Sequence, residues 1–246
     1  MNTIENIKCD CGETFEWDAT GLDELNHRWK PKRCQQCDDR FWAEREAQQV
    51  AWADEGIAQN KAYIAKRIND ATPKLFQKTD IDHPKFNSSA WVKIQKFKLS
   101  EEIPWIGLVG MTGRCKSRMA YLYAANELKR LTSGSLPKFA FVASYEINDA
   151  VTRLHCDFAQ KAEARQFLDS LREVDVLLID DLGKGRLTPT VASELFALID
   201  HRYVNRETTI WTSNSSPEVI ASGLPEDMAG PFIGRINESS KIFTFK

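Results

Sequence analysis

Residues 110–117 combine two glycines, a lysine and a hydroxyl at a spacing that could bind phosphate. The segment follows an apolar run at residues 105–109 and precedes residues with helical spacing, so we expect strand, loop and helix in that order. In such a loop the backbone N–H groups bind phosphate oxygens, the lysine reaches the terminal phosphates and the hydroxyl binds Mg²⁺. The predicted nucleotide-binding residues are Gly110, Met111, Thr112, Gly113, Arg114, Cys115, Lys116 and Ser117. An ordinary strand-to-helix turn is the alternative.

Cys115 departs from this pattern, because a second glycine is expected directly before the lysine. Glycine there lets the backbone approach the phosphates with dihedral angles that a side chain resists. A Cβ atom forced to positive φ costs about 1 kcal/mol. Gly113, Lys116 and Ser117 keep the rest of the loop, so we expect nucleotide binding more than rapid hydrolysis.

Two carboxylates follow a second apolar run, since Asp180 and Asp181 come directly after residues 174–179. Mg²⁺ binds one or two carboxylates and retains several waters, so we expect Asp180 to hold it together with Ser117. Asp181 could polarise or deprotonate an attacking water molecule. We expect this strand beside the phosphate-loop strand. The alternative is a strand that ends in solvent-exposed acids.

A polar amide ends another run rich in β-branched residues. Asn214 directly follows residues 208–213, which are typical of a strand. At the carboxyl end of a parallel strand, this amide could orient a water molecule against the γ-phosphate. The local sequence Thr-Ser-Asn-Ser-Ser-Pro is also an ordinary turn signal.

The N-terminal segment holds paired cysteines at a spacing that suits a metal ion. Cys9 and Cys11 form the first pair, and Cys34 and Cys37 form the second. In a reducing compartment such pairs favour a tetrahedral zinc site over disulfides. A segment this small needs metal binding for its stability. Free thiols are the alternative, and His27 could replace one cysteine.

The composition indicates a globular protein that does not bind nucleic acid by charge alone. The 246 residues are 42% hydrophobic and 28% charged, with a net charge of -2. No apolar stretch is long enough to span a membrane, and the N-terminus lacks a secretory signal, so we expect a cytoplasmic protein. Residues 61–98 are locally basic, with nine Lys or Arg against three Asp. They could face DNA phosphates or form a solvated helix face.

The order of the elements predicts an α/β fold. Five apolar runs alternate with segments of helical spacing, which favours a parallel five-stranded sheet between helices. The expected strands are residues 105–109, 139–144, 174–179, 208–213 and 241–245. We expect three regions along the chain. These are a zinc-binding head at 1–40, a helical linker or partner-binding region at 41–72, and an ATPase domain at 73–246.

Helical composition between residues 41 and 71 predicts one long helix or two shorter ones. An apolar stripe runs along it, which we expect to pack on the ATPase domain or on a partner protein. The stripe consists of Trp42, Val50, Trp52, Ile57, Tyr63, Ile64 and Ile68.

Together these motifs resemble an AAA+ ATPase of the initiator and helicase-loader group, over residues 73–245. The DnaC/DnaI/IstB type is most similar, including phage-encoded relatives with an N-terminal cysteine cluster. The resemblance implies that Lys116 and Ser117 belong to Walker A, and Asp180 and Asp181 to Walker B. It also implies that Asn214 is the sensor 1 residue. Arg235 is the candidate arginine finger, which would complete the site of a neighbouring subunit.

The resemblance further implies ATP, Mg²⁺ and Zn²⁺ as ligands, and a replicative helicase and single-stranded DNA as partners. It implies self-association into an AAA+ oligomer and no membrane partner. The chain ends where related proteins often continue into a helical lid, so we expect no such lid in residues 73–246. A transposition or regulatory ATPase that delivers duplex DNA to a recombinase is one alternative. A catalytically weakened adaptor protein is another.

Overall fold

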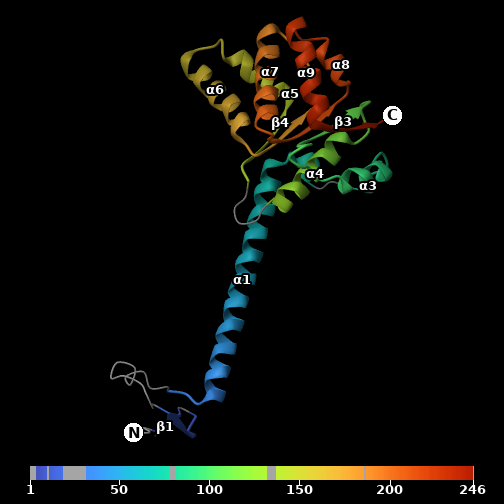
Figure 1. The fold of residues 1–246 in the computed structure, drawn as a ribbon. Helices are drawn as coiled ribbons and strands as arrows, with labels where there is room; N and C mark the ends of the chain where they lie inside the picture. Colours follow the sequence, from blue (N-terminus) through green and yellow to red (C-terminus); the bar gives the residue numbers. More distant parts are fainter. Residues whose placement is uncertain are drawn as a thin grey trace. The chain divides into compact units, whose positions relative to one another are not determined.

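The computed structural model divides the chain into two compact units, Met1–Ala62 and Tyr63–Lys246, here named the N-terminal unit and the C-terminal unit (Figure 1). The residues that the structure describes are 4–9, 11–18, 32–77, 81, 83–131, 137–185 and 187–245. Within these ranges, every helix is too short or too polar to cross a membrane.

The N-terminal unit contains an antiparallel hairpin of β1 (Ile4–Lys8) and β2 (Thr14–Asp18). Inward and outward positions alternate along both strands, but none of their residues is buried. The buried hydrophobic residues described in this unit are Cys9 and Cys34, which are 3% and 7% exposed. Among the described residues, the hairpin therefore has no apolar core of its own, as the short cysteine-rich segment predicts.

Helix α1 (Gln35–Ala71) is one continuous helix of 37 residues. Ile64 and Ile68, near its end, are buried in the C-terminal unit. The stripe residues before them are more than half exposed, so only the last part of the predicted stripe packs within the described residues. These exposed residues are Trp42, Val50, Ile57 and Tyr63. The side chain of Trp52 lies outside the described residues.

The C-terminal unit is built on the predicted parallel five-stranded sheet, with the strand order β4-β5-β6-β3-β7. The strands are β3 (Trp105–Gly110), β4 (Phe139–Ala143), β5 (Val176–Asp180), β6 (Thr208–Ser213) and β7 (Ser240–Phe245). The helices after α1 are α2 (Lys74–Gln77), α3 (Ser88–Lys96), α4 (Lys116–Leu131), α5 (Ser144–Arg153), α6 (Phe158–Glu173), α7 (Pro189–Val204), α8 (Pro217–Ala221) and α9 (Glu226–Ser239).

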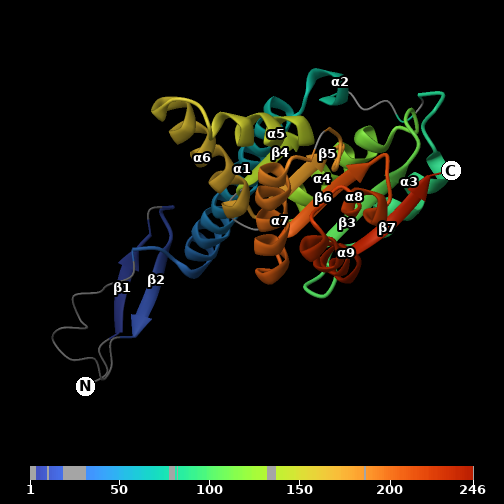
Figure 2. The same ribbon diagram turned by 90° about the horizontal axis from the view of Figure 1, so that it is seen from above.

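Helices cover both faces of this sheet, as Figures 1 and 2 show. Because side chains alternate along a strand, β5 sends Leu177 and Ile179 into one core and Val176 and Leu178 into the other. Helices α5 to α9 close the first core, and α3, α4 and the end of α1 close the second. Burial on both faces explains why the strands read as continuous apolar runs.

One expectation about the sheet is wrong. Strand β6 lies between β3 and β5, so the acid-bearing strand is not directly beside the phosphate-loop strand. The order of strands depends on how the connecting helices pack across the sheet, which local sequence patterns do not record. The order nevertheless places the end of β6, and with it Asn214, between the phosphate loop and the two aspartates.

A close contact in the middle of the sheet gives a stability prediction. Gly107 on β3 pairs with Trp211 on β6, and a Cβ atom at Gly107 would overlap the Trp211 indole. We expect Gly107→Ala to lower the free energy of unfolding by about 1–3 kcal/mol, because the packed core cannot accept the methyl group. Gly230→Ala, in open space on α9, is the matched control, and urea denaturation measures both variants. Equal stability of the two variants would contradict this packing.

Candidate functional site

The phosphate loop connects the end of β3 to the start of α4 at Lys116. The Lys116 side chain is folded inward: its Nζ donates to Met111 O and to Asn214 Oδ1, both at 2.9 Å. Burial lowers the pKa of Lys116, and the charges of Asp181 and Asp180 oppose this shift. The ammonium group is therefore held next to the ends of β3 and β6, in reach of the cavity described below.

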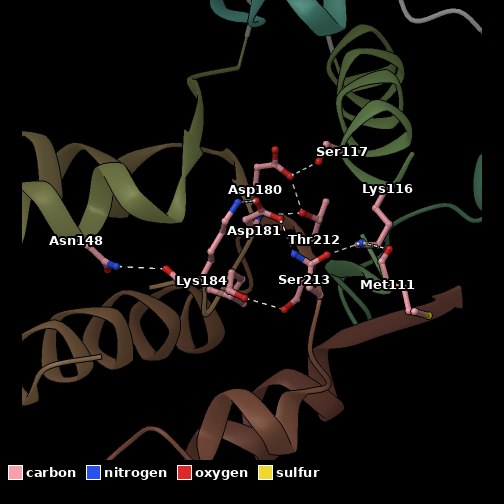
Figure 3. A network of polar contacts seen from close by, with 11 residues as sticks. Met111, Lys116, Ser117, Asn148, Asp180, Asp181, Lys184, Thr212 and Ser213 are labelled. Atoms are coloured by element: carbon pink, nitrogen blue, oxygen red, sulfur yellow. Dashed lines mark hydrogen bonds and ion pairs between the residues drawn. The ribbon is translucent and has the colours of Figure 1, made fainter. Parts of the chain in front are cut away.

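Asp180 is the meeting point of three elements (Figure 3). Its Oδ1 accepts a hydrogen bond of 2.7 Å from Ser117 Oγ on α4 and one of 2.6 Å from Thr212 Oγ1 on β6. Thr212 Oγ1 in turn accepts from the backbone N–H of Asp181 at 2.9 Å. The structure thus brings together two predicted magnesium ligands that are far apart in sequence. Thr212 was missed, although it lies on β6, two residues before Asn214.

Asp181 has the left-handed backbone conformation, with φ at 57°. Its Oδ2 pairs with Lys184 Nζ at 2.7 Å, and Asn214 Nδ2 donates to its Oδ1 at 3.5 Å. Asn214 therefore links Lys116 to Asp181 through the two ends of one amide. Lys184 was not predicted, because nothing in its spacing distinguishes it from a surface lysine.

Cys115 has the strained backbone that the sequence predicts, with φ at 57°. The Cβ atom in this conformation costs about 1 kcal/mol. Its Sγ lies 3.6 Å from His83 Nδ1, which also accepts from the backbone N–H of Lys85 at 3.2 Å. The backbone at this position therefore keeps the left-handed conformation, although Cys115 carries a side chain where glycine is usual.

A cavity of about 460 Å³ lies at this loop, a volume in the range of ligand sites. Five basic residues line it against one acidic residue, so its charge favours an anion. The lining residues are Phe76, His83, Lys85, Thr112, Gly113, Arg114, Cys115, Lys116, Ser117, Arg118, Asp181, Lys184 and Asn214. Met111 lines a neighbouring cavity. Gly110 ends β3, and Asp180 lines another cavity beside this one.

Solved structures share this arrangement of sheet and helices. A DnaC helicase loader matches 74% of this chain and 99% of its own, with 24% identity and a TM-score of 0.51. DnaI matches 74% of this chain and 94% of its own, with 18% identity and a TM-score of 0.51. Domain III of DnaA from Thermotoga maritima matches 72% of this chain and 68% of its own, with 15% identity and a TM-score of 0.52.

The chain shares the fold of the DnaC and DnaI structures. No protein-family model and no curated protein sequence matches it, so the likeness is one of structure. The chain spans 45% of the length of a DnaA structure from Aquifex aeolicus, with a TM-score of 0.47.

Arg235 lies on α9 and faces α7. Its Nε contacts Asp200 Oδ1 at 2.5 Å, and its guanidinium lies over the rings of Phe196 and Tyr203. The described residues that line the phosphate-loop cavity do not include Arg235. The structure therefore does not bring this residue into the site of its own chain.

The predicted cysteines form a compact group in the N-terminal unit, here named the thiol cluster. The Sγ atoms of Cys9, Cys11, Cys34 and Cys37 all lie within 4.8 Å of one another. A tetrahedral ion with Zn–S bonds of about 2.3 Å requires sulfur atoms about 3.8 Å apart, and Cys11 and Cys34 are 3.8 Å apart. His27 lies outside the described residues.

The electrostatics of the thiol cluster also suit a metal ion. The backbone N–H of Cys34 donates to Cys9 Sγ at 3.2 Å. Backbone N–H groups of Cys11 and Cys34 lower the pKa of the Cys9 thiol to about 6. Neighbouring thiols, Cys11 first, raise the pKa of Cys37 to about 12. Four sulfurs lie close together, and a divalent cation would stabilise their thiolates.

We expect about one Zn²⁺ per purified chain, because the four sulfurs fit one tetrahedral ion. Cys37→Ser should lose most of this zinc, since serine is a poor zinc ligand. Cys156→Ser, at an exposed cysteine outside the cluster, is the control and should keep it. Metal analysis by mass spectrometry measures both. Full zinc occupancy in Cys37→Ser would show that the cluster is not the zinc site.

Proposed function

We propose that this chain is an ATP-binding AAA+ protein that loads or remodels a replicative helicase on single-stranded DNA. The observation that carries the proposal is the bridge made by Asn214, which contacts Lys116 on one side and Asp181 on the other. It joins the phosphate loop to the acidic strand end across an anion-favouring cavity. A nucleotide site needs a phosphate loop and an acidic strand end close to each other.

The loop from Gly110 to Ser117 would bind the phosphates through its backbone N–H groups and Lys116. Ser117 and Asp180 would hold Mg²⁺, and their direct hydrogen bond of 2.7 Å supports a shared ligand position. The bound ion would neutralise charge on the β- and γ-phosphate oxygens.

Asp181 and Asn214 would act on the attacking water molecule. Both side chains line the cavity, and the amide of Asn214 lies 3.5 Å from the carboxylate of Asp181. Asp181 would accept the proton from water or polarise it, while Asn214 would fix its position. Arg235 would complete the site of a neighbouring subunit, which requires an AAA+ oligomer.

The assignment of partners rests on the fold and on the surface. The DnaC helicase loader shares the fold, which supports a helicase as the partner. Residues 1–40 would form a zinc-binding head and residues 41–72 a partner-binding region, where the exposed apolar residues of α1 support a protein contact. Residues 73–246 would form the ATPase domain, and the basic segment at 61–98 would contact single-stranded DNA.

The direct test is ATP binding and steady-state hydrolysis, with and without single-stranded DNA. Lys116→Ala should weaken ATP binding about ten- to hundredfold, because a charged hydrogen-bond donor to the phosphates is lost. Lys129→Ala, at an exposed lysine on the same helix, should bind ATP as the natural protein does. Equal ATP affinity of these two variants would contradict the nucleotide site.

Cys115→Gly separates an active site from a silenced one. If Cys115 is tolerated, the natural protein and Cys115→Gly should both bind ATP, and single-stranded DNA should stimulate turnover in both. The strained backbone at Cys115 favours the second candidate, an adaptor protein with a silenced site. In that case only Cys115→Gly would bind and hydrolyse ATP, as isothermal titration and phosphate release would measure.

Arg235→Ala tests the arginine finger. We expect unchanged ATP binding and a loss of about 10³-fold or more in the turnover that rises with protein concentration. Arg206→Ala changes another arginine near Tyr203 and should keep this turnover. Unchanged turnover in Arg235→Ala would remove the assignment.

A further inference from the structure

The turn after Asp181 holds one lysine against that carboxylate. The backbone N–H of Lys184 donates to Asp181 O at 2.9 Å and closes the turn. Gly183 and Gly185 flank the lysine with φ at 80° and 107°, a conformation that other residues rarely adopt. A Cβ atom on Gly183 would lie 2.8 Å from Ile220. The backbone on both sides of Lys184 is therefore specified by glycine.

A second element fixes the same turn. Asn148 on α5 donates from Nδ2 to Lys184 O at 3.4 Å, as Figure 3 shows. A Cβ atom on Gly185 would lie 2.8 Å from Asn148 Nδ2. Helix α5 and the two glycines thus place the start of the Lys184 side chain near the end of β5.

The Lys184 side chain is bound at its tip and free along its length. Nζ lies 2.7 Å from Asp181 Oδ2, while 67% of the side chain is exposed. The hydrogen bond and the charge of Asp181 raise the pKa of Lys184, so the ammonium is charged at neutral pH. The contact from Asn214 to the other oxygen is longer, at 3.5 Å. Lys184 is therefore the closest donor on Asp181 among the described residues.

This contact matters for a carboxylate that must act on water. An ammonium on Oδ2 competes with a water molecule for the same oxygen. We propose that Lys184 is a positioning residue that holds Asp181 in a resting ion pair, which must open before the carboxylate can engage the attacking water. This inference rests on the proposed ATPase function. The exposed stem of Lys184 leaves room for the ammonium to move into solvent.

Lys184 also lines the phosphate-loop cavity, so its effect on ATP binding is measured apart from its effect on the chemical step. Its ammonium forms an ion pair with Asp181, and four other basic residues line the cavity. These are Lys85, Arg114, Lys116 and Arg118. Loss of Lys184 should therefore raise the rate of the chemical step once ATP saturates the site.

The kinetic test compares Lys184→Met with Lys184→Arg. Lys184→Met removes the charge at similar length and should raise kcat for ATP hydrolysis, at saturating ATP, about two- to fivefold, the range of an exposed ion pair. Lys184→Arg keeps the ion pair and should keep the natural kcat. Lys161→Met, on the exposed part of α6, controls for the change in net charge. An unchanged or lower kcat at saturating ATP in Lys184→Met would overturn the proposal.

The second test needs no nucleotide. Acetylation of each lysine by an amine-reactive reagent is followed by mass spectrometry in the natural protein and in Asp181→Asn. An ammonium paired with a carboxylate is hard to deprotonate, so Lys184 should react several-fold faster in Asp181→Asn, relative to Lys161 in the same sample. Equal relative rates would show that the resting pair does not form in solution.

The two tests also separate this inference from the proposed function. If the natural protein binds no ATP but Lys184 acetylation still depends on Asp181, the ion pair stands and its role in hydrolysis falls with the ATPase. If ATP binding depends on Lys116 but Lys184→Met changes nothing, the ATPase stands and the inference falls.

Discussion

The hydrogen bonds on Asp180 Oδ1 hold the candidate site together. Ser117 brings the start of α4 to this atom, and Thr212 brings the end of β6. A carboxylate oxygen that accepts two hydroxyl donors forms stronger bonds than a neutral acceptor would. Asp180 therefore sets the spacing between the phosphate loop and the neighbouring strand ends before any ligand binds.

The two cores make this spacing rigid. Each buried strand has one set of side chains under α5 to α9 and the other set under α3, α4 and the end of α1. Helix α4 carries both Lys116 and part of the second core, so its packing determines where Lys116 and the end of the phosphate loop lie. The site is precise because its side chains stand on elements that are buried on both faces.

Local patterns in the sequence were enough to predict the sheet, the loop and the thiol cluster. The run before Gly110 and the acids after the third strand are short-range signals, and the cysteine pairs have a metal-binding spacing. Local patterns could not predict the strand order, because the packing of the connecting helices across the sheet determines it. Thr212, Lys184 and His83 were missed for a related reason: a threonine in a strand, a lysine in a turn and a histidine in a loop acquire their contacts only through the fold. The pairing of Arg235 with Asp200 likewise depends on how α9 packs against α7.

The alternation along β6 ties the site to the cores. Ile210 packs in the α4-side core and Trp211 in the opposite core, while Thr212, two residues after Ile210, reaches Asp180. A slip of β6 by one residue would turn Thr212 away from Asp180 and would exchange Ile210 and Trp211 between the cores. The register of β6 therefore determines both the core packing and the geometry around Asp180. A mutation that shifts this register would disrupt both together. Substitutions that change the site without unfolding the protein must therefore leave the register of β6 intact.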